Sequence, residues 1–174
     1  MNNIEKYAEL FQILCEHSSS EKKLGKKATQ KMFYFFERKG LNLNLRYGIH
    51  FFGPYSAKLD NVMHILENED ILSIDYSGVT HVITMGSEHI SDNSLNSNER
   101  DIANEVIDTF FNKSASELEA LATMDFIANF ILDKPSSKDS IIKRFKEIKA
   151  DKFDSRVIED TYDELVGLGY INAA

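Results

Sequence analysis

The chain has 174 residues, of which 43% are apolar and 28% charged, an ordinary composition for a soluble globular protein of one or two domains. Its two prolines and eight glycines argue against long linkers. A net charge of −8 at pH 7 makes non-specific nucleic-acid binding unfavourable, because phosphate repels an acidic protein.

The first forty residues predict two helices. Apolar side chains recur at helical spacing over residues 3–17: Ile4, Tyr7, Ala8, Phe11, Leu14 and Cys15. A polar break follows, and a second stripe predicts a helix over residues 23–39: Leu24, Ala28, Met32, Phe35 and Phe36. Gly40 stands where a helix C-cap favours glycine.

Cys15 is the single cysteine, so no internal disulfide can form, and its place in an apolar stripe predicts a buried, unreactive thiol. The N-terminus shows neither a basic segment nor an apolar core of a signal peptide. No apolar run approaches the length of a membrane span, so we expect a cytoplasmic protein without a membrane partner.

A change of period predicts a strand over residues 44–52, where apolar and polar side chains alternate. Ser56 is suited to cap a following helix, Ser56 to Glu69, with the stripe Leu59, Val62, Met63 and Leu66. We expect Phe51 and Tyr55 to pack on the aromatic residues of the second helix. The structural turn between strand and helix is then Gly53, Pro54, Tyr55 and Ser56.

Two short β-prone runs joined by Ser77-Gly78 predict a hairpin, and the polar residues 86–99 predict a loop. Beyond residue 97 the sequence predicts only helices. Ser116 and Glu119 match a capping box before one of them, and Glu119 and Asp125 are expected to be solvated. The helical stripes include Ile102, Val106, Ile107 and Phe110, then Ile141, Ile142 and Phe145, and finally Val157, Ile158 and Leu165.

The predicted elements follow the order of a winged helix-turn-helix domain, which is helix, helix, strand, helix and hairpin. We therefore predict a mostly helical α+β protein. Residues 1–86 would form a winged-helix-like domain with a β-hairpin wing, and residues 97–174 a helical extension packed on it or continuous with it.

Charge is distributed unevenly along the chain. Residues 1–60 hold ten Lys and Arg against six Asp and Glu, whereas residues 61–133 hold two against fourteen. Five lysines cluster at the start of the second helix, where they oppose the helix dipole, so an acidic partner or the acidic middle segment should compensate them. The candidate contacts to a partner or nucleic acid are Lys22, Lys23, Lys26, Lys27, Lys31, Lys58, Asn61 and His64.

In a DNA-binding version of this fold, the helix from Ser56 would enter the major groove and the wing would touch phosphate. The same region carries acidic residues that oppose this: Asp60, Glu67, Glu69, Asp70 and Asp75. The wing contains no lysine or arginine, which favours a solvated or protein-binding face.

Catalytic and metal-binding patterns are missing from the sequence. Its five histidines lack metal-ligand spacing, and no nucleophile, P-loop or dinucleotide motif occurs. The sequence therefore predicts no enzyme, cofactor or metal.

Residues 20–85 resemble the YwgA-like and SocA-like (Panacea) antitoxin-domain proteins of bacteria and phages. The positions that carry the resemblance are Gln30, Lys31, Tyr34, Tyr47, Phe51, Gly53, Pro54, Tyr55, Ser56, Leu59 and Leu66. Ala28-Thr29 departs from that pattern, in which leucine usually precedes the glutamine. The resemblance implies a non-enzymatic protein that neutralises a partner protein or acts as an adaptor.

Three functions follow as hypotheses. The first is binding of a partner protein, antitoxin-like or phage-encoded, with the acidic segment 61–133 complementing a basic partner. The second is DNA binding by a winged-helix regulator, and the third is acidic mimicry of nucleic acid against a host nuclease or repressor. A homodimer is compatible with each.

Overall fold

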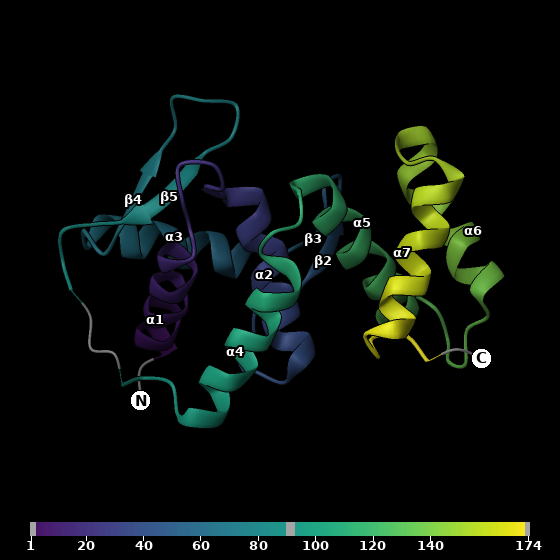
Figure 1. Cartoon of the computed structure of the whole chain (residues 1–174), viewed down its shortest axis with the longest axis horizontal. Coiled ribbons are helices and arrows are strands. Elements are labelled where there is room, and N and C mark those ends of the chain that lie inside the picture. Colours follow the sequence, from purple (N-terminus) through teal and green to yellow (C-terminus); the bar gives the residue numbers. More distant parts are fainter. Residues whose placement is uncertain (1–2, 90–92, 173–174) are drawn as a thin grey trace. The chain divides into compact units, whose positions relative to one another are not determined.

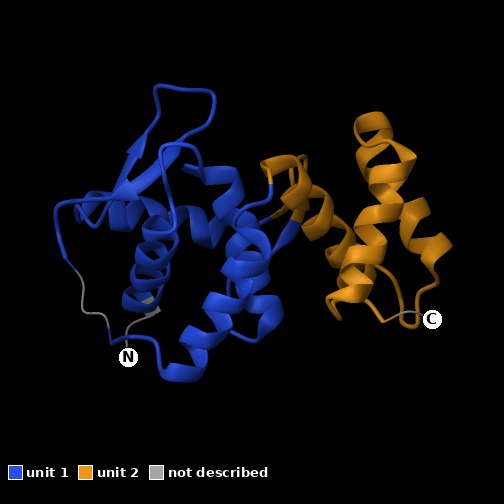
Figure 2. Ribbon diagram, in the orientation of Figure 1, with its two compact units in different colours: residues 1–48, 55–113 blue, residues 49–54, 114–174 orange. Residues whose placement is uncertain are grey.

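A computed structural model describes residues 3–89 and 93–172 of the chain. Within them the protein is mostly helical with small antiparallel sheets, which confirms the predicted α+β class (Figure 1). The chain forms two compact units (Figure 2). Unit 1 comprises residues 1–48 and 55–113, and unit 2 comprises residues 49–54 and 114–174.

Unit 1 begins with two helices that match the predicted ones closely, since their apolar stripes are buried. Its elements, together with the hairpin shared with unit 2, are α1 (Asn3–Glu16), β1 (Leu24–Gly25), α2 (Lys26–Lys39), β2 (Gly48–His50), β3 (Gly53–Tyr55), α3 (Ala57–Asn68), β4 (Leu72–Asp75), β5 (Val82–Met85) and α4 (Ser97–Phe110). Helix α4 was expected within the C-terminal extension 97–174, whereas it is grouped with unit 1.

Aromatic side chains of α1, α2 and α4 build the core of unit 1. The rings of Phe11 and Phe33 lie 4.8 Å apart, and those of Phe35 and Phe110 stack at 4.0 Å. All four side chains are fully buried. Offset and tilted aromatic pairs of this kind add stability beyond the area that they bury.

A three-stranded antiparallel sheet covers this core, in the order β1-β5-β4. The predicted hairpin is confirmed, but its turn is longer than Ser77-Gly78. Asp75 pairs with Val82, so the connection is the six-residue loop 76–81. Strand β1 was not predicted, because two residues are too few to show a period.

The predicted strand over 44–52 is wrong in its first half. Leu43 and Leu45 are buried and their neighbours exposed, as in a strand, but Asn44 and Arg46 have φ values of 55° and 54°. These left-handed residues make the chain curl rather than extend. The carboxylate of Glu37 accepts a hydrogen bond from the Leu45 N–H (3.1 Å) and holds this loop.

Residues 49–54 form the tip of the β2–β3 hairpin and are grouped with unit 2. The expectation that Phe51 packs on the second helix is wrong, because its side chain is 81% exposed and its ring contacts Phe52. Tyr47 takes that place instead, with its ring edge-on to Tyr34 at 5.2 Å.

Unit 2 is helical apart from the hairpin tip, as predicted. Its helices are α5 (Ala115–Phe126), the π-helix η1 (Ile127–Ile131), α6 (Lys138–Lys149), the 3-10 helix η2 (Ala150–Lys152) and α7 (Ser155–Gly167). No helix in the described part of the chain is both long and apolar enough to cross a membrane.

Two predictions about α5 are wrong. Its capping box is formed by Ser114 and Glu117 rather than Ser116 and Glu119, so the helix begins one residue after Ser114. Glu119 and Asp125 are buried instead of solvated. Both serines are followed by glutamate at the third position, so the capping pattern alone could not choose between them.

Candidate functional site

Helix α3 is fixed at its first turn by two buried polar side chains. Ser56 caps the helix as predicted, its Oγ accepting a hydrogen bond from the Leu59 N–H (3.1 Å). Gln30 of α2 bonds both polar groups of the Ser56 backbone: its Nε2 donates to the carbonyl (3.0 Å), and its Oε1 accepts from the N–H (2.9 Å). The angle at which α3 leaves the turn is therefore tied to α2.

The exposed side of α3 carries the predicted candidates Lys58, Asn61 and His64. Lys58 Nζ donates to the Asn44 carbonyl (2.9 Å), so this cation binds its own chain. His64 lies between two carboxylates, with Nε2 3.7 Å from Asp60 and Nδ1 3.5 Å from Glu67. An acidic environment thus surrounds the residues expected to reach DNA.

The loop between β4 and β5 extends this acidic side with apolar residues. Tyr76 Oη donates to Glu67 of α3 (2.8 Å), and its ring lies edge-on to His81 at 4.9 Å. Val79 is 98% exposed, an unusual position for a branched aliphatic side chain. We define the α3 surface as the exposed residues Asn61, His64, Ile65, Tyr76 and Val79 together with the half-buried Asp60 and Glu67.

Few basic residues lie in the chain around this surface. Residues 59–99, which contain most of α3 and both strands of the hairpin, hold no lysine or arginine. The cation of α2 nearest to it is engaged, since Lys26 Nζ lies 2.7 Å from Asp60. The α3 surface therefore combines negative charge with exposed apolar side chains.

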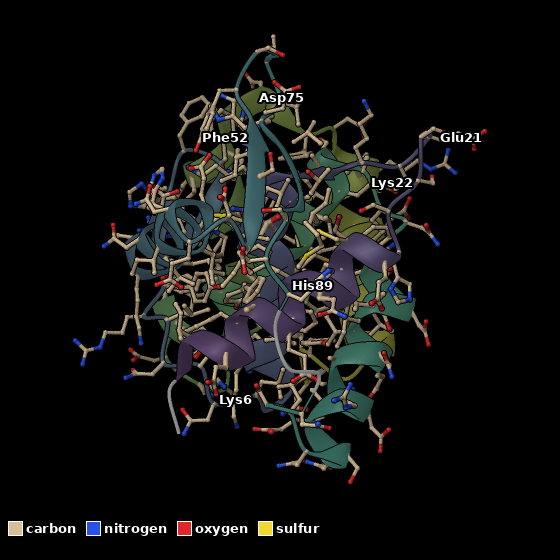
Figure 3. All side chains as sticks on the ribbon, turned by 90° about the vertical axis from the view of Figure 1, so that its left-hand side faces the viewer. Lys6, Glu21, Lys22, Phe52, Asp75 and His89 are labelled. Carbon is tan, nitrogen blue, oxygen red and sulfur yellow. The ribbon has the colours of Figure 1, made fainter. Side chains whose placement is uncertain are left out.

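The five lysines at positions 22–31 do not form one basic face. Lys31 is buried, which corrects its choice as a candidate contact to a partner or nucleic acid. Lys22 donates to the backbone carbonyl of Lys113, whereas Lys23 and Lys27 are exposed. Figure 3 shows Lys22 in the loop that follows α1, away from Asp75 at the end of β4.

Elsewhere in unit 1, charged residues of the N-terminal third pair with opposite charges of the segment 61–133. Lys6 binds Glu99 and Lys39 lies 2.6 Å from Glu105, whereas Arg100 of the acidic segment binds Glu9. Part of the uneven charge of the sequence is therefore paired within unit 1. Each unit has a net charge of −4, from twelve cations against sixteen acids in unit 1 and eight against twelve in unit 2.

A cleft of about 420 Å³ with a mixed polar and apolar lining lies at the end of α1, beside β1, β4 and β5. It is lined by Cys15, Ser18, Ser19, Lys23, Leu24, Ser73, Asp75, Val82, Ile83 and Thr84. Burial, with a smaller effect of Glu16, raises the pKa of Cys15 to about 11, so the thiol is protonated at neutral pH and a poor nucleophile. Among the described residues, no three His, Cys, Asp or Glu side chains are placed to hold a metal ion.

A scan against protein-family models and a search of curated proteins found no match to this chain. Function must therefore be argued from the surface itself. Ile65, Tyr76 and Val79 were not singled out from the sequence, because isolated apolar residues in a helix or hairpin are usually buried. The one available signal was the lack of lysine and arginine in the hairpin loop.

Proposed function

We propose that this is a non-catalytic cytoplasmic protein that binds a partner protein through the α3 surface, as an antitoxin-like or adaptor-like protein. The observation that carries the proposal is the α3 surface itself, on which an almost fully exposed Val79 lies in a hairpin loop without a single cation. Apolar residues with a rim of charge favour a protein partner, and the acidic rim favours a basic one.

We further propose that α1, α2, α3 and the β1-β5-β4 sheet constitute a winged-helix-like domain. The order of these elements and the pairing of β1 with β5 support this interpretation. The β2–β3 hairpin would then be an insertion between the second and third helices. The resemblance to Panacea antitoxin-domain proteins supports the same assignment and the same kind of partner.

The proposal is tested with the products of adjacent genes, purified and mixed with this protein on a size-exclusion column. We expect one of them to form a stable complex that Val79→Asp weakens about tenfold or more, as expected for an apolar contact at an interface centre. Val157→Asp is the matched control, since Val157 is a partly exposed valine of α7. Lack of a complex with every neighbour, or equal weakening by both substitutions, would contradict the proposal.

DNA binding is the second candidate, favoured by the exposure of Lys58, Asn61 and His64 on α3. It is the weaker one because the flanking carboxylates and the cation-free loop oppose phosphate contacts. Acidic mimicry of nucleic acid shares the electrostatics of the leading proposal. It predicts in addition that duplex DNA displaces this protein from its captured partner.

A further inference from the structure

The tip of the β2–β3 hairpin presents two phenylalanines to solvent. Phe51 is 81% exposed and Phe52 39%, and their rings lie 4.9 Å apart and nearly perpendicular. Hairpin tips usually carry small or polar turn residues, so adjacent exposed rings need a reason. Unit 2 contains both these residues and the groups that hold them.

A buried lysine fixes the backbone of this tip. Lys149 Nζ donates to the Phe51 carbonyl (2.8 Å) and to Glu119 Oε1 (2.7 Å). The Lys149 and Glu119 side chains are only 2% and 7% exposed. Burying such a pair is costly and seldom adds net stability over apolar packing, so a role in positioning is the better explanation.

A second lysine lies against the rings themselves. Lys152 Nζ is 5.1 Å from the Phe52 ring centroid and 5.8 Å from that of Phe51. The same ammonium donates to both Glu119 oxygens at 2.8 Å, so this one carboxylate is shared by Lys149 and Lys152. The net charge of unit 2 is negative, which disfavours phosphate or an anionic lipid surface as the ligand of the tip.

We propose that this tip, residues 49–54, is a preorganised aromatic anchor that inserts into an apolar pocket of a partner protein. This inference rests on the proposed function and adds a second contact site for the same partner. Aromatic side chains dominate the binding energy of protein interfaces, and a loop held in place before binding loses less entropy on association. The Lys149–Glu119 pair supplies that rigidity.

The test places a photo-crosslinking phenylalanine analogue at position 51 or position 79 in cells that naturally make the protein. Crosslinks from both positions to one identified protein support the anchor and the α3 surface together. Crosslinks from position 79 alone overturn the anchor and leave the proposed function intact. Crosslinks from position 51 alone support the tip as a contact site but overturn the α3 surface and the partner shared with it, and none from either position overturns both.

The identified partner is then purified and its affinity measured by calorimetry. We expect Phe51→Ser to weaken binding about thirtyfold, the typical effect of losing an aromatic hot spot. Leu168→Ser is the control, since this leucine of unit 2 is also exposed and lies outside the tip. The exposure of Phe51 means that its substitution leaves the fold intact, so an unchanged affinity would overturn the anchor.

Discussion

Tyr7 and Tyr47 both lie near Glu37, but they differ in whether the hydroxyl group has a hydrogen-bond partner. Tyr7 Oη donates to the Leu43 carbonyl at 2.6 Å. The Tyr47 hydroxyl is buried and, among the described residues, has no hydrogen-bond partner. Burial, and secondarily the charge of Glu37, raises the pKa of Tyr7 to about 12 and that of Tyr47 well above its usual range.

Removing each hydroxyl should therefore have opposite effects. Tyr47→Phe deletes a buried group that has lost its water without gaining a partner, so we expect the free energy of unfolding to rise by up to about 1 kcal/mol. Tyr7→Phe removes the shorter of two hydrogen bonds to the Leu43 carbonyl and leaves only the long one from Lys58 Nζ (3.4 Å), so it should lower the free energy of unfolding by about 1 kcal/mol. Urea unfolding of both variants measures this, and equal effects would show that Tyr47 does find a partner in solution.

At the scale of elements, the helices were predictable and the segment 41–47 was not. A helix with one buried side repeats its apolar residues at a fixed interval, as α3 does with Leu59, Val62, Met63 and Leu66. Alternating burial identifies a strand only if the backbone is extended. Nothing in the sequence shows that Asn44 and Arg46 adopt left-handed φ values.

The start of α5 shows a second limit. Glu119 was assigned to a local capping box, but its carboxylate binds Lys149 and Lys152, thirty residues and more along the chain. A pattern of four residues contains no information on such a distant partner. The buried ion pair and the exposed hairpin tip that it holds were therefore not predictable.

This ion pair makes the stability of unit 2 depend on pH. Burial alone would raise the pKa of Glu119, but the hydrogen bonds and charges of Lys149 and Lys152 outweigh it and hold the pKa below its usual value. A carboxyl group with a lowered pKa contributes stability above its unfolded-state pKa. That contribution is lost as the pH falls through the lower, folded-state pKa.

Glu119→Gln should consequently lower the free energy of unfolding by about 3 kcal/mol near neutral pH, because it leaves Lys149 buried without a counter-charge. The difference from wild type should shrink as the pH falls through the lowered folded-state pKa of Glu119, because the wild-type carboxylate is then itself protonated. Urea unfolding at neutral pH and at an acidic pH below that pKa measures this. Glu159→Gln is the control: it alters an exposed pair with Lys138 and should change the free energy of unfolding little at either pH. A loss of stability in Glu119→Gln that does not depend on pH would contradict the account.

At the scale of the whole molecule, the sequence predicted the amount of charge but not its arrangement. The basic first third and the acidic middle pair with each other inside unit 1 through Lys6–Glu99 and Lys39–Glu105, and Lys26 pairs with Asp60 within the first third. Lys26 is compensated by Asp60, which lies in the N-terminal third itself rather than in a partner or in the acidic segment 61–133 that we expected to do this. The lysine cluster is consequently a weaker candidate for nucleic acid than its sequence indicates.

Partner binding by the α3 surface is tested most directly by two titrations of the same protein. One follows binding of the adjacent-gene product by calorimetry, and the other follows a labelled DNA duplex by fluorescence anisotropy at low salt. We predict saturable protein binding that Val79→Asp weakens, and a flat duplex curve. Duplex binding that falls steeply with salt and with the double substitution Lys26→Glu, Lys27→Glu, together with no binding of the protein, would contradict the account.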